Sequence, residues 1–424
     1  MYKLIIPFIV LIICSCSSSN EEVAKPRILI SSDIGGTDPD DNQSMIHFLM
    51  YSDMFQTEGL ISSPSYGEGS KEEILKMIDL YEMDLPKLKQ HSSGFPAPDS
   101  LRAICKQGRK GAAPFVGYQN ATEGSDWIIQ CAQKESEQPL WILVWGGLDD
   151  LAQALHDAPE IQNKIKVYWI GGPNKKWSTN SYAYIVENFP GLWFIEANAV
   201  YRGFFSNTGS PDSLSNENYD ANFIDEAGYM GKAFKNYYGG RIKMGDTPSL
   251  LYVMNGNPLN PLTDSWGGSF EKIFHSPRSI FHGNTTLSDT VPVYSMIEYH
   301  FKDQDLNIPI DSACFIMTVG GQKWDGYHLG NGEYVVRYAP KKAETLAYEI
   351  SSGIPGLDGQ NGQLVVRNVW PGNPSENDYK LGDNWYTDPS NPELFDNGWQ
   401  GAKTVLKWRT DALSDWAERW EWLE

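Results

Sequence analysis

From about residue 26 to residue 200 the sequence alternates short apolar runs with amphipathic stretches, and this alternation constrains the fold more than any other feature. The apolar runs are "RILISSD", "TEGLISSPS", "PLWILVWGG", "KIKVYWIGGP" and "LWFIEAN". Between them, stretches such as "DNQSMIHFLMYS" and "SKEEILKMIDLYEM" place apolar residues at helical spacing. Strands this apolar are buried on both faces, and their alternation with helices predicts parallel βαβ units with right-handed crossovers. We therefore expect an open, mostly parallel α/β sheet.

The pattern changes from about residue 290 onward. Runs such as "GEYVVRYAP", "TLAYEISS" and "GQLVVRNVW" are rich in β-branched and aromatic residues and are separated by Gly, Pro and Asn. This predicts an all-β, sandwich-like domain. Because 424 residues exceed what one core usually covers, we expect two domains, an α/β domain over 26–288 and a β domain over 289–424. The closing stretch "DALSDWAERWEWLE" is expected to form a helix or tail that packs back on the body.

Residues 1–16 contain one lysine followed by an apolar run, which is too short to span a bilayer and is typical of a signal-peptide core. The small Ser15 before Cys16 resembles the bacterial lipobox, in which the cysteine is lipidated and becomes the new N-terminus. Cys14 fits less well because bulky Ile13 precedes it. The alternative is an ordinary secretory signal with an incidental cysteine. In both cases we expect export, with residues 17–25 as a linker and, if Cys16 is lipidated, a membrane anchor in the cell envelope.

The overall charge bears on the class of ligand. The formal net charge of −20 would repel polyphosphate, and no basic run overrides it, so nucleic-acid binding is not expected. A neutral or cationic small ligand fits this charge better. The 15 Trp and 22 Tyr residues are of a kind that lines carbohydrate or base sites, although such rings also fill cores.

Four aspartates follow the first predicted strand within nine residues, namely Asp33, Asp38, Asp40 and Asp41. Ligands of open α/β sheets bind outside the carboxyl ends of the strands, which is where this cluster would lie. Neighbouring carboxylates raise one another's pKa values unless a cation compensates them. Oxygen ligands favour Ca²⁺ or Mg²⁺ over Zn²⁺, and the seven histidines are scattered rather than grouped.

Other interpretations of the acidic cluster remain open at this point. The aspartates could form a solvated turn before a helix N-terminus, where acids are favourable. They could form an EF-hand-like loop, but the glycine and glutamate spacing of that loop is missing. A phosphoaspartate loop is also conceivable, without its accompanying Lys and Thr signatures. The cluster alone does not decide among them.

The combination of motifs is more specific. An apolar strand ending in Asp33, then Asp40 and Asp41 opening a helix, then "VWGGLDDLAQAL", "YWIGGP" and "FIEANA", resembles the inosine-uridine-preferring nucleoside hydrolases. It is more similar still to an exported bacterial branch of that superfamily described as cellulose-binding with a nucleoside hydrolase-like domain. The resemblance covers roughly residues 26–285. It implies a hydrolase that cleaves the glycosyl bond of an N-riboside or related glycoside with a water molecule activated by Ca²⁺.

The resemblance also implies a metal site and a catalytic base. Asp33 matches the strand-end ligand and general base, and Asp41 matches the bidentate ligand that ends the motif. Asp149 takes the place where a backbone carbonyl reaches the metal in the family. Asp246, in "MGDTPS", is similar to the late aspartate that completes the metal sphere.

Substrate contacts are expected from two groups of residues. The resemblance implies contacts with sugar hydroxyls by Asp40, Glu196 and Asn198. The polarity of their loops makes stacking or hydroxyl contacts possible for Trp177, Trp266 and Asn180, with loop anchoring as the alternative for the two tryptophans. We expect Arg202 either to pair with Glu196 or Asp149 or to contact the substrate.

The chain departs from the family pattern at three places. Ser31 replaces the first aspartate of the leading motif, and three extra residues before Asp40 leave Asp38 without an assigned role. Gly245 stands where many nucleoside hydrolases carry a histidine near the leaving base, which removes a candidate general acid. The natural leaving group is therefore not expected to be a purine. The rival interpretation is a non-catalytic carbohydrate-binding protein on the same scaffold.

Overall fold

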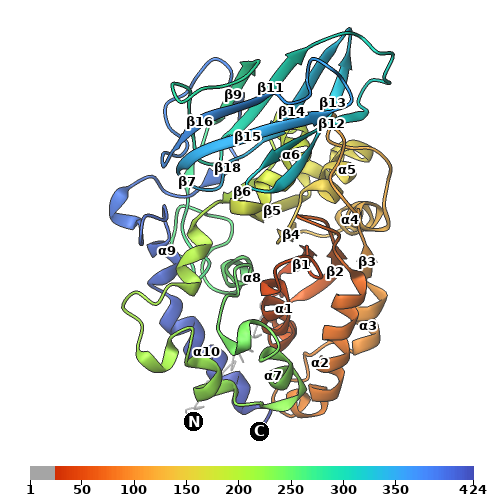
Figure 1. Ribbon diagram of the computed structural model, residues 1–424. Helices are drawn as coiled ribbons and strands as arrows, with labels where there is room; N and C mark the ends of the chain where they lie inside the picture. Colours follow the sequence, from red (N-terminus) through yellow and green to blue (C-terminus); the bar gives the residue numbers. More distant parts are fainter. Residues whose placement is uncertain (1–23) are drawn as a thin grey trace, which may run out of the picture.

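The computed structural model describes residues 24–424. The expected signal peptide, with Cys16, lies outside the described residues. Figure 1 shows an α/β domain in its middle and lower parts and a β domain above it. Among the described helices, none is long and apolar enough to cross a membrane.

The α/β domain is built on an eight-stranded sheet with the strand order β3-β2-β1-β4-β5-β6-β18-β7. All neighbouring strands are parallel except β18 and β7, so the predicted open, mostly parallel sheet is confirmed. The strands are β1 (Arg27–Ser32), β2 (Gln56–Ser62), β3 (Cys105–Gln107), β4 (Leu140–Val144), β5 (Ile165–Ile170), β6 (Phe194–Ala197), β7 (Glu271–Lys272) and β18 (Trp385–Thr387).

Helices cover both faces of this sheet because alternate residues of each strand point to opposite sides. Ile28 and Ile30 of β1 belong to the core that includes side chains of α1, α2, α8 and α10, while Leu29 belongs to the core that includes α4, α5 and α6. The helices of the first 290 residues are α1 (Asp40–Met50), α2 (Lys71–His91), α3 (Pro98–Ala103), α4 (Glu123–Gln133), α5 (Asp149–Asp157), α6 (Thr179–Asn188), α7 (Gly228–Phe234) and α8 (Thr247–Met254).

The β domain contains a second eight-stranded sheet with the order β10-β16-β15-β12-β13-β14-β11-β9. Most of its pairs are antiparallel, and the predicted all-β character is confirmed. Its strands are joined in one sheet, with β10 and β9 at the edges. They are β9 (Arg278–His282), β10 (Thr290–Pro292), β11 (Met296–Lys302), β12 (Ala313–Val319), β13 (Gln322–Gly330), β14 (Glu333–Tyr338), β15 (Glu344–Ser352) and β16 (Asn361–Arg367); β8 (His275–Ser276) and β17 (Tyr379–Lys380) form a separate pair.

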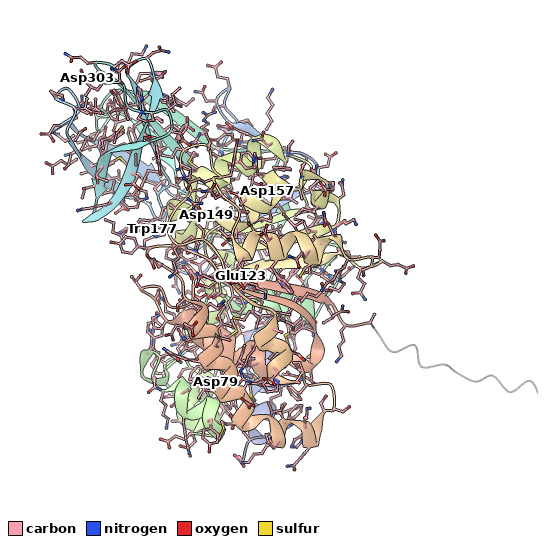
Figure 2. All side chains as sticks on the ribbon, turned by 90° about the vertical axis from the view of Figure 1, so that its right-hand side faces the viewer. Asp79, Glu123, Asp149, Asp157, Trp177 and Asp303 are labelled. Carbon is pink, nitrogen blue, oxygen red and sulfur yellow. The ribbon has the colours of Figure 1, made fainter. Side chains whose placement is uncertain are left out.

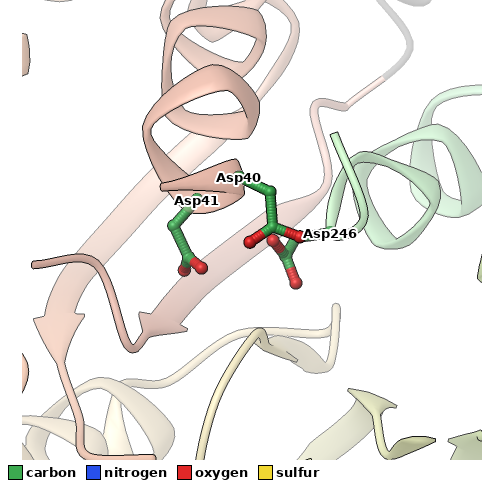
Figure 3. Close-up of side chains that lie close together, drawn as sticks. All are labelled: Asp40, Asp41 and Asp246. Carbon is green, nitrogen blue, oxygen red and sulfur yellow. The ribbon is translucent and has the colours of Figure 1, made fainter. Parts of the chain in front are cut away.

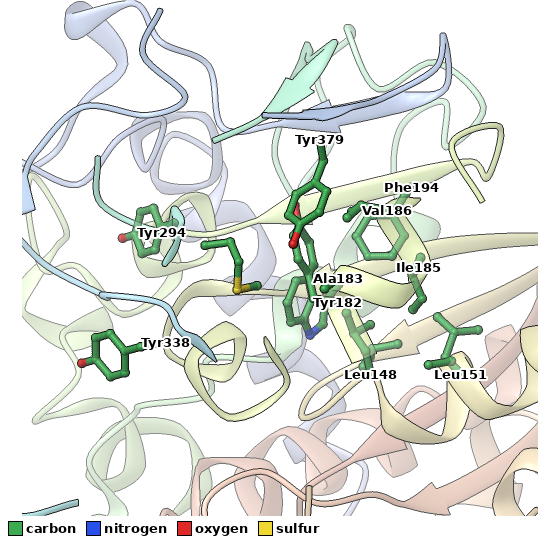
Figure 4. Packing of buried hydrophobic residues seen from close by; sticks show 14 of the residues in the cluster. Leu148, Leu151, Tyr182, Ala183, Ile185, Val186, Phe194, Tyr294, Tyr338 and Tyr379 are labelled. Atoms are coloured by element: carbon green, nitrogen blue, oxygen red, sulfur yellow. The ribbon is translucent and has the colours of Figure 1, made fainter. Parts of the chain in front are cut away.

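The two domains share one hydrophobic core. Leu148 and Leu151 belong to the same buried cluster as Tyr294, Tyr338 and Tyr379. Figure 4 shows these side chains close together, between the α/β domain and the β domain. The junction between the domains is therefore a packed interface, which fixes the β domain over the carboxyl-end rim of the first sheet.

The last forty residues return to the α/β domain, which differs from the expected domain of residues 289–424. Strand β18 pairs in parallel with β6, and α9 (Lys403–Leu406) and α10 (Arg409–Glu421) follow it. Trp416 and Trp420 of α10 are fully buried in the core that contains α1, and Arg419 forms an ion pair of 2.7 Å with Asp53. Burial of these apolar rings stabilises the packing of the C-terminal segment on the α/β domain. Figure 1 shows α10 beside α7, at the end of the molecule away from the β domain.

Candidate functional site

The acidic cluster lies at the topological switch point of the α/β sheet. The chain continues from β1 to β2 on one side of the sheet and from β4 to β5 on the other, so the strand order reverses between the neighbours β1 and β4. Such a reversal opens a crevice at the carboxyl ends of the two strands. Asp33 follows β1, and Trp145 follows β4. Both line a cavity of about 270 Å³, which is bounded by the loops after β1, β2, β4, β5 and β6, by the segment before α8 and by two residues of the β domain.

Three carboxylates converge in this cavity. Asp40 and Asp41 form the first turn of α1, and Asp246 immediately precedes α8, so the two helix starts bring them together (Figure 3). One carboxylate oxygen of each lies within 4.8 Å of those of the other two. No cation of the protein is inserted among them: within the described chain, the only lysine paired with any of the three is Lys243, whose Nζ lies 3.8 Å from Asp40.

The raised pKa values of the three aspartates show that it is unfavourable to keep all three carboxylates ionised. Burial raises the pKa of Asp40 to about 7, although Lys243 lowers it. Burial, together with the charges of Asp33, Asp246 and Asp40, raises the pKa of Asp41 well above its usual range. The pKa of Asp246 is raised well above its usual range by burial and by Asp40 and Asp33. Carboxylates that repel one another in a buried site are compensated when a cation binds.

Two further observations fit a hard divalent cation. The Oδ2 atom of Asp246 is buried without any hydrogen-bond partner, and an orphaned buried carboxylate oxygen is unfavourable unless a ligand meets it. The donor set is made of oxygen atoms alone, which suits Ca²⁺ or Mg²⁺. Asp40, expected as a sugar contact, therefore lies with Asp41 and Asp246 as a candidate ligand.

Asp33 lies beside this trio. Burial raises its pKa, against hydrogen bonds with Asp41 and Ser65 that lower it. A β-carbon added at Gly146 would come within 2.6 Å of the Asp33 Cβ, so the glycine after β4 lets the two loops approach closely. Asp33 is thus placed in the cavity, at a position from which it can serve as a base.

Asp38, which had no assigned role, forms an ion pair with Lys243. The same lysine is therefore shared between Asp38 and Asp40. Next to it, a β-carbon added at Gly245 would come within 2.9 Å of the Asp40 Oδ2 atom. A histidine at residue 245 would collide with the present position of Asp40, which gives a structural reason for the glycine.

Asp149 and Asn180 lie in a second cavity of about 260 Å³ rather than with the trio. The Asp149 carboxylate accepts hydrogen bonds from the Ala113 backbone (2.7 Å) and from Ser178 and Ser181 (3.1 Å each). The Asn180 amide donates to the Ala113 carbonyl. The expectation of a metal contact at Asp149 is corrected, because Asp149 lines this second cavity and not the cavity that holds the trio.

Glu196 and Asn198 are not available to a ligand in the cavity. Both side chains are fully buried, and neither lines the cavity. The Glu196 carboxylate accepts from Lys175 Nζ at 2.8 Å, from the Tyr182 hydroxyl at 2.7 Å and from Asn198 at 2.9 Å. This corrects the expectation of sugar contacts, because the buried lysine neutralises the acid and fills its hydrogen-bonding capacity. Arg202 pairs with neither Glu196 nor Asp149 among the described contacts.

Trp177 and Trp266 have different positions. Trp177 lines both cavities and stacks on Trp324 of the β domain, with ring centroids 4.5 Å apart, and its ring centroid lies 4.3 Å from that of Tyr66. In Figure 2 the labels of Trp177 and Asp149 lie where the two domains meet. Trp177 is therefore a wall between the cavities. Trp266 lines neither cavity and packs against the core beside α8.

Several lining residues gave no signal in the sequence. Lys176 and Lys243 looked like ordinary polar loop residues, and Gln322 and Lys341 come from the β domain, where no site pattern was visible. Asp388 is also unanticipated: it is fully buried and accepts hydrogen bonds from the backbone of Asn198, Ala199 and Val200, which fixes the segment that carries Arg202. Only the folded chain brings these distant residues together.

Comparison with known proteins gives two family matches. The sequence model of a family described as cellulose-binding Sde182, nucleoside hydrolase-like domain, matches residues 27–270. The model of a domain of unknown function, DUF5060, matches residues 290–353. No curated protein matches the chain.

Solved structures show the same architecture. A nucleoside hydrolase-related hypothetical protein from Saccharophagus degradans, described as associated with carbohydrate metabolism, superposes with a TM-score of 0.51 and 18% identity, over 82% of this chain and 100% of that one. An inosine-uridine preferring nucleoside hydrolase from Bacillus anthracis has a TM-score of 0.41 and 13% identity, over 93% of this chain and 99% of that one. The first of these likenesses shows the fold.

Proposed function

The chain belongs to the family described as cellulose-binding Sde182, nucleoside hydrolase-like domain, and from this membership we propose that it is a calcium-dependent hydrolase of a glycosyl bond. One observation carries the proposal. At the switch point of the sheet, Asp40, Asp41 and Asp246 converge without a cation among them, and one buried oxygen of Asp246 has no partner. Binding of a saccharide alone does not require a water molecule held by a metal ion, whereas hydrolysis in this scheme does.

The proposed chemistry assigns roles to the carboxylates of the cavity. Asp40, Asp41 and Asp246 would hold the ion. Calcium bound there would act as a Lewis acid toward a water molecule and toward sugar hydroxyls. Asp33, whose pKa is raised by burial, has a carboxylate that is a stronger base than an exposed aspartate and accepts the proton of the attacking water.

The same carboxylates favour the positive charge that develops on the sugar ring as the glycosyl bond breaks. A single water attacks directly in this scheme, so inversion at the anomeric carbon is expected. Gly245 leaves no histidine to protonate a purine, and an O-linked sugar or an activated base would serve as the leaving group.

The proposal includes the cellular location. We propose that the protein is exported and anchored to the cell-envelope membrane by lipidation at Cys16. The apolar run of residues 4–13 and the Ser15–Cys16 pair support this. Labelling of the expressed protein with a radioactive fatty acid tests it; label in the wild type and in Cys14→Ser but not in Cys16→Ser is the expected result.

A screen of nucleosides and aryl furanosides, with calcium or with EDTA, tests the enzymatic proposal. We expect turnover with calcium, loss of turnover with EDTA, and loss in Asp33→Ala with calcium binding retained. Asp38→Asn is the matched control from the same loop, since Asp38 pairs with Lys243 outside the trio. Turnover that ignores both EDTA and Asp33→Ala would refute the proposal.

A second candidate function is non-catalytic binding of a carbohydrate. The family description and the Tyr66–Trp177–Trp324 stack between the two cavities favour it. Retained binding of cello-oligosaccharides without turnover of any glycoside would support it over hydrolysis.

A further inference from the structure

Three cationic side chains line the cavity of the acidic cluster, yet none of them pairs with it. They are Lys176, Arg202 and Lys341. Among residues 24–424, no carboxylate forms an ion pair with any of the three, whereas Lys243 on the same cavity pairs with Asp38 and lies near Asp40. The cavity therefore has a second charged group, of opposite sign to the first.

The first two cations are held in defined positions. Lys176 is only 5% exposed, donates from Nζ to the Gln322 Oε1 atom at 2.7 Å, and lies 4.3 Å from the Trp177 ring centroid. The Arg202 Cζ atom lies 3.7 Å from the Trp399 ring centroid, and its Nε atom is buried without a hydrogen-bond partner. Stacked guanidinium groups keep their edge free for a planar oxyanion.

The strongest charges acting on these lysines are other cations. Burial lowers the pKa of Lys176 to about 8, and the positive charge of Lys341, the largest charge effect on Lys176, lowers it further. The pKa of Lys341 is lowered by burial and then by Arg202. The cations thus repel one another much as the aspartates do, so they are not explained as counter-charges for Asp33, Asp41 or Asp246. A bound anion would remove this repulsion.

We infer that the substrate carries an oxyanion, such as a carboxylate, sulfate or phosphate group, which Lys176, Arg202 and Lys341 bind while the glycosyl group lies at the acidic cluster. This inference rests on the proposed function and names its substrate class, an anionic glycoside. The net charge of −20 suggested a neutral or cationic ligand. The three cations on this side of the cavity favour an anionic ligand instead. The overall charge describes the whole surface, whereas binding depends on the local potential.

The inference also gives the β domain a role in the site. Gln322 is the first residue of β13 and Lys341 follows β14, and both reach the cavity of the α/β domain. Arg202 is held by the C-terminal segment through Trp399 and Asp388. Lys341 of the anion-binding wall is therefore supplied by the β domain, whereas Lys176, Arg202 and the acidic cluster lie within residues 27–270 of the nucleoside hydrolase-like region.

Isothermal titration calorimetry on the full chain tests the inference, with and without calcium. The probes are D-galacturonate, glucose 6-sulfate and glucose 6-phosphate, each compared with the neutral galactose or glucose. We expect at least one anion to bind about tenfold more tightly than its neutral counterpart, as charged hydrogen bonds imply, and the best of the three identifies the anionic group. Equal binding of anionic and neutral sugars, or no binding of any anion, would overturn the inference.

Two neighbouring lysines provide the matched variants. Lys341→Gln should weaken binding of the preferred anion about tenfold and leave binding of the neutral sugar unchanged. Lys342→Gln is the control, because Lys342 is 57% exposed and pairs with Glu344 instead of lining the cavity. Equal losses in both variants would contradict the assignment. Failure of the hydrolase proposal would appear separately, as absent turnover of every glycoside with anion binding intact.

Discussion

Two of the buried acidic groups of this protein, one in each domain, differ in how their charge is compensated. In the β domain, Glu298 is 1% exposed and accepts from Arg337 at 2.7 Å, from Arg278 at 2.6 Å and from His300 at 3.4 Å. Burial alone would raise the pKa of Glu298, but these partners hold it well below its usual range. At the switch point, burial raises the pKa of Asp246 well above its usual range. Among residues 24–424, the one cation that pairs with the three converging carboxylates is Lys243, 3.8 Å from Asp40.

The difference separates a structural acid from a functional one. Arg337 also donates to the Phe115 carbonyl at 2.7 Å, so the Glu298 network ties the β domain to the α/β domain. Its charges are satisfied within the protein. The acidic trio is satisfied only in part. Lys243 lies 3.8 Å from Asp40 and Ser32 donates to Asp41, but one buried oxygen of Asp246 has no partner. The trio lies in a cavity where a ligand can reach it. A group of buried carboxylates that lines a cavity and is only partly compensated therefore marks the candidate site, whereas a buried carboxylate paired with arginines belongs to the framework.

Breaking the compensated site should have the largest effect on stability. Arg337→Met leaves a buried carboxylate with fewer partners and should lower the free energy of unfolding by about 3–5 kcal/mol. Urea denaturation measures this. The control is Lys342→Met, which removes an exposed pair with Glu344 and should cost less than about 1 kcal/mol. Similar losses in the two variants would remove the distinction between framework and surface charge.

Filling the uncompensated site should stabilise the protein. Calcium at one hundred times its dissociation constant should raise the free energy of unfolding by about 2.7 kcal/mol, because it binds only the folded chain. Urea denaturation with and without calcium measures the increase. Asp41→Asn should lose the effect and Asp38→Asn should keep it. An equal calcium effect in both variants would place the ion elsewhere.

The two sites should respond to pH in opposite directions in metal-free protein. The pKa of Asp40 is raised from 3.8 to about 7, so its contribution to stability is present below pH 3.8 and is lost as pH rises toward 7. The lowered pKa of Glu298 contributes stability above pH 4.5 that is lost as pH falls below it. We expect Glu298→Gln to weaken the acid-side loss and Asp40→Asn to weaken the neutral-side loss, each by about 1–2 kcal/mol, in urea denaturation from pH 3 to 8. Unchanged pH profiles would contradict the assignment.

Removing one repelled carboxylate should have the smallest effect. In metal-free protein at pH 8, Asp246→Asn should raise the free energy of unfolding by about 1 kcal/mol, since burying one fewer charge relieves the repulsion. Thermal unfolding with EDTA measures this. Destabilisation comparable to that of Arg337→Met would show that Asp246 is a structural acid.

Local patterns in the sequence predict most strands and helices of the first 200 residues, but not α3, β3 or α6. The apolar runs and helical spacing predict β1, β4 and α2 because burial on both faces and helical periodicity are local properties. Strand β18 could not be predicted, because its three residues carry no local strand pattern and form a strand only by pairing with β6. Its position depends on contacts nearly two hundred residues away in sequence.

The site was predictable to a similar degree. The acidic loop and Asp246 were found by resemblance, and the helix starts of α1 and α8 bring them together as a group. Glu196 was misassigned because the sequence does not show that Lys175 lies buried against it at 2.8 Å. Lys341 was missed because its loop enters the cavity from the other domain. Charge compensation is a property of the folded chain, so local sequence patterns do not predict which buried acids have a cationic partner.

Calorimetric titration of calcium into metal-free wild-type protein and into Asp246→Asn tests the central claim most directly. The account predicts one binding site in the wild type and an affinity at least about one hundredfold weaker in the variant, since even outer partners of metal sites change affinity ten- to one hundredfold. Equal calcium affinity in the two proteins, or no calcium binding by the wild type, would contradict it.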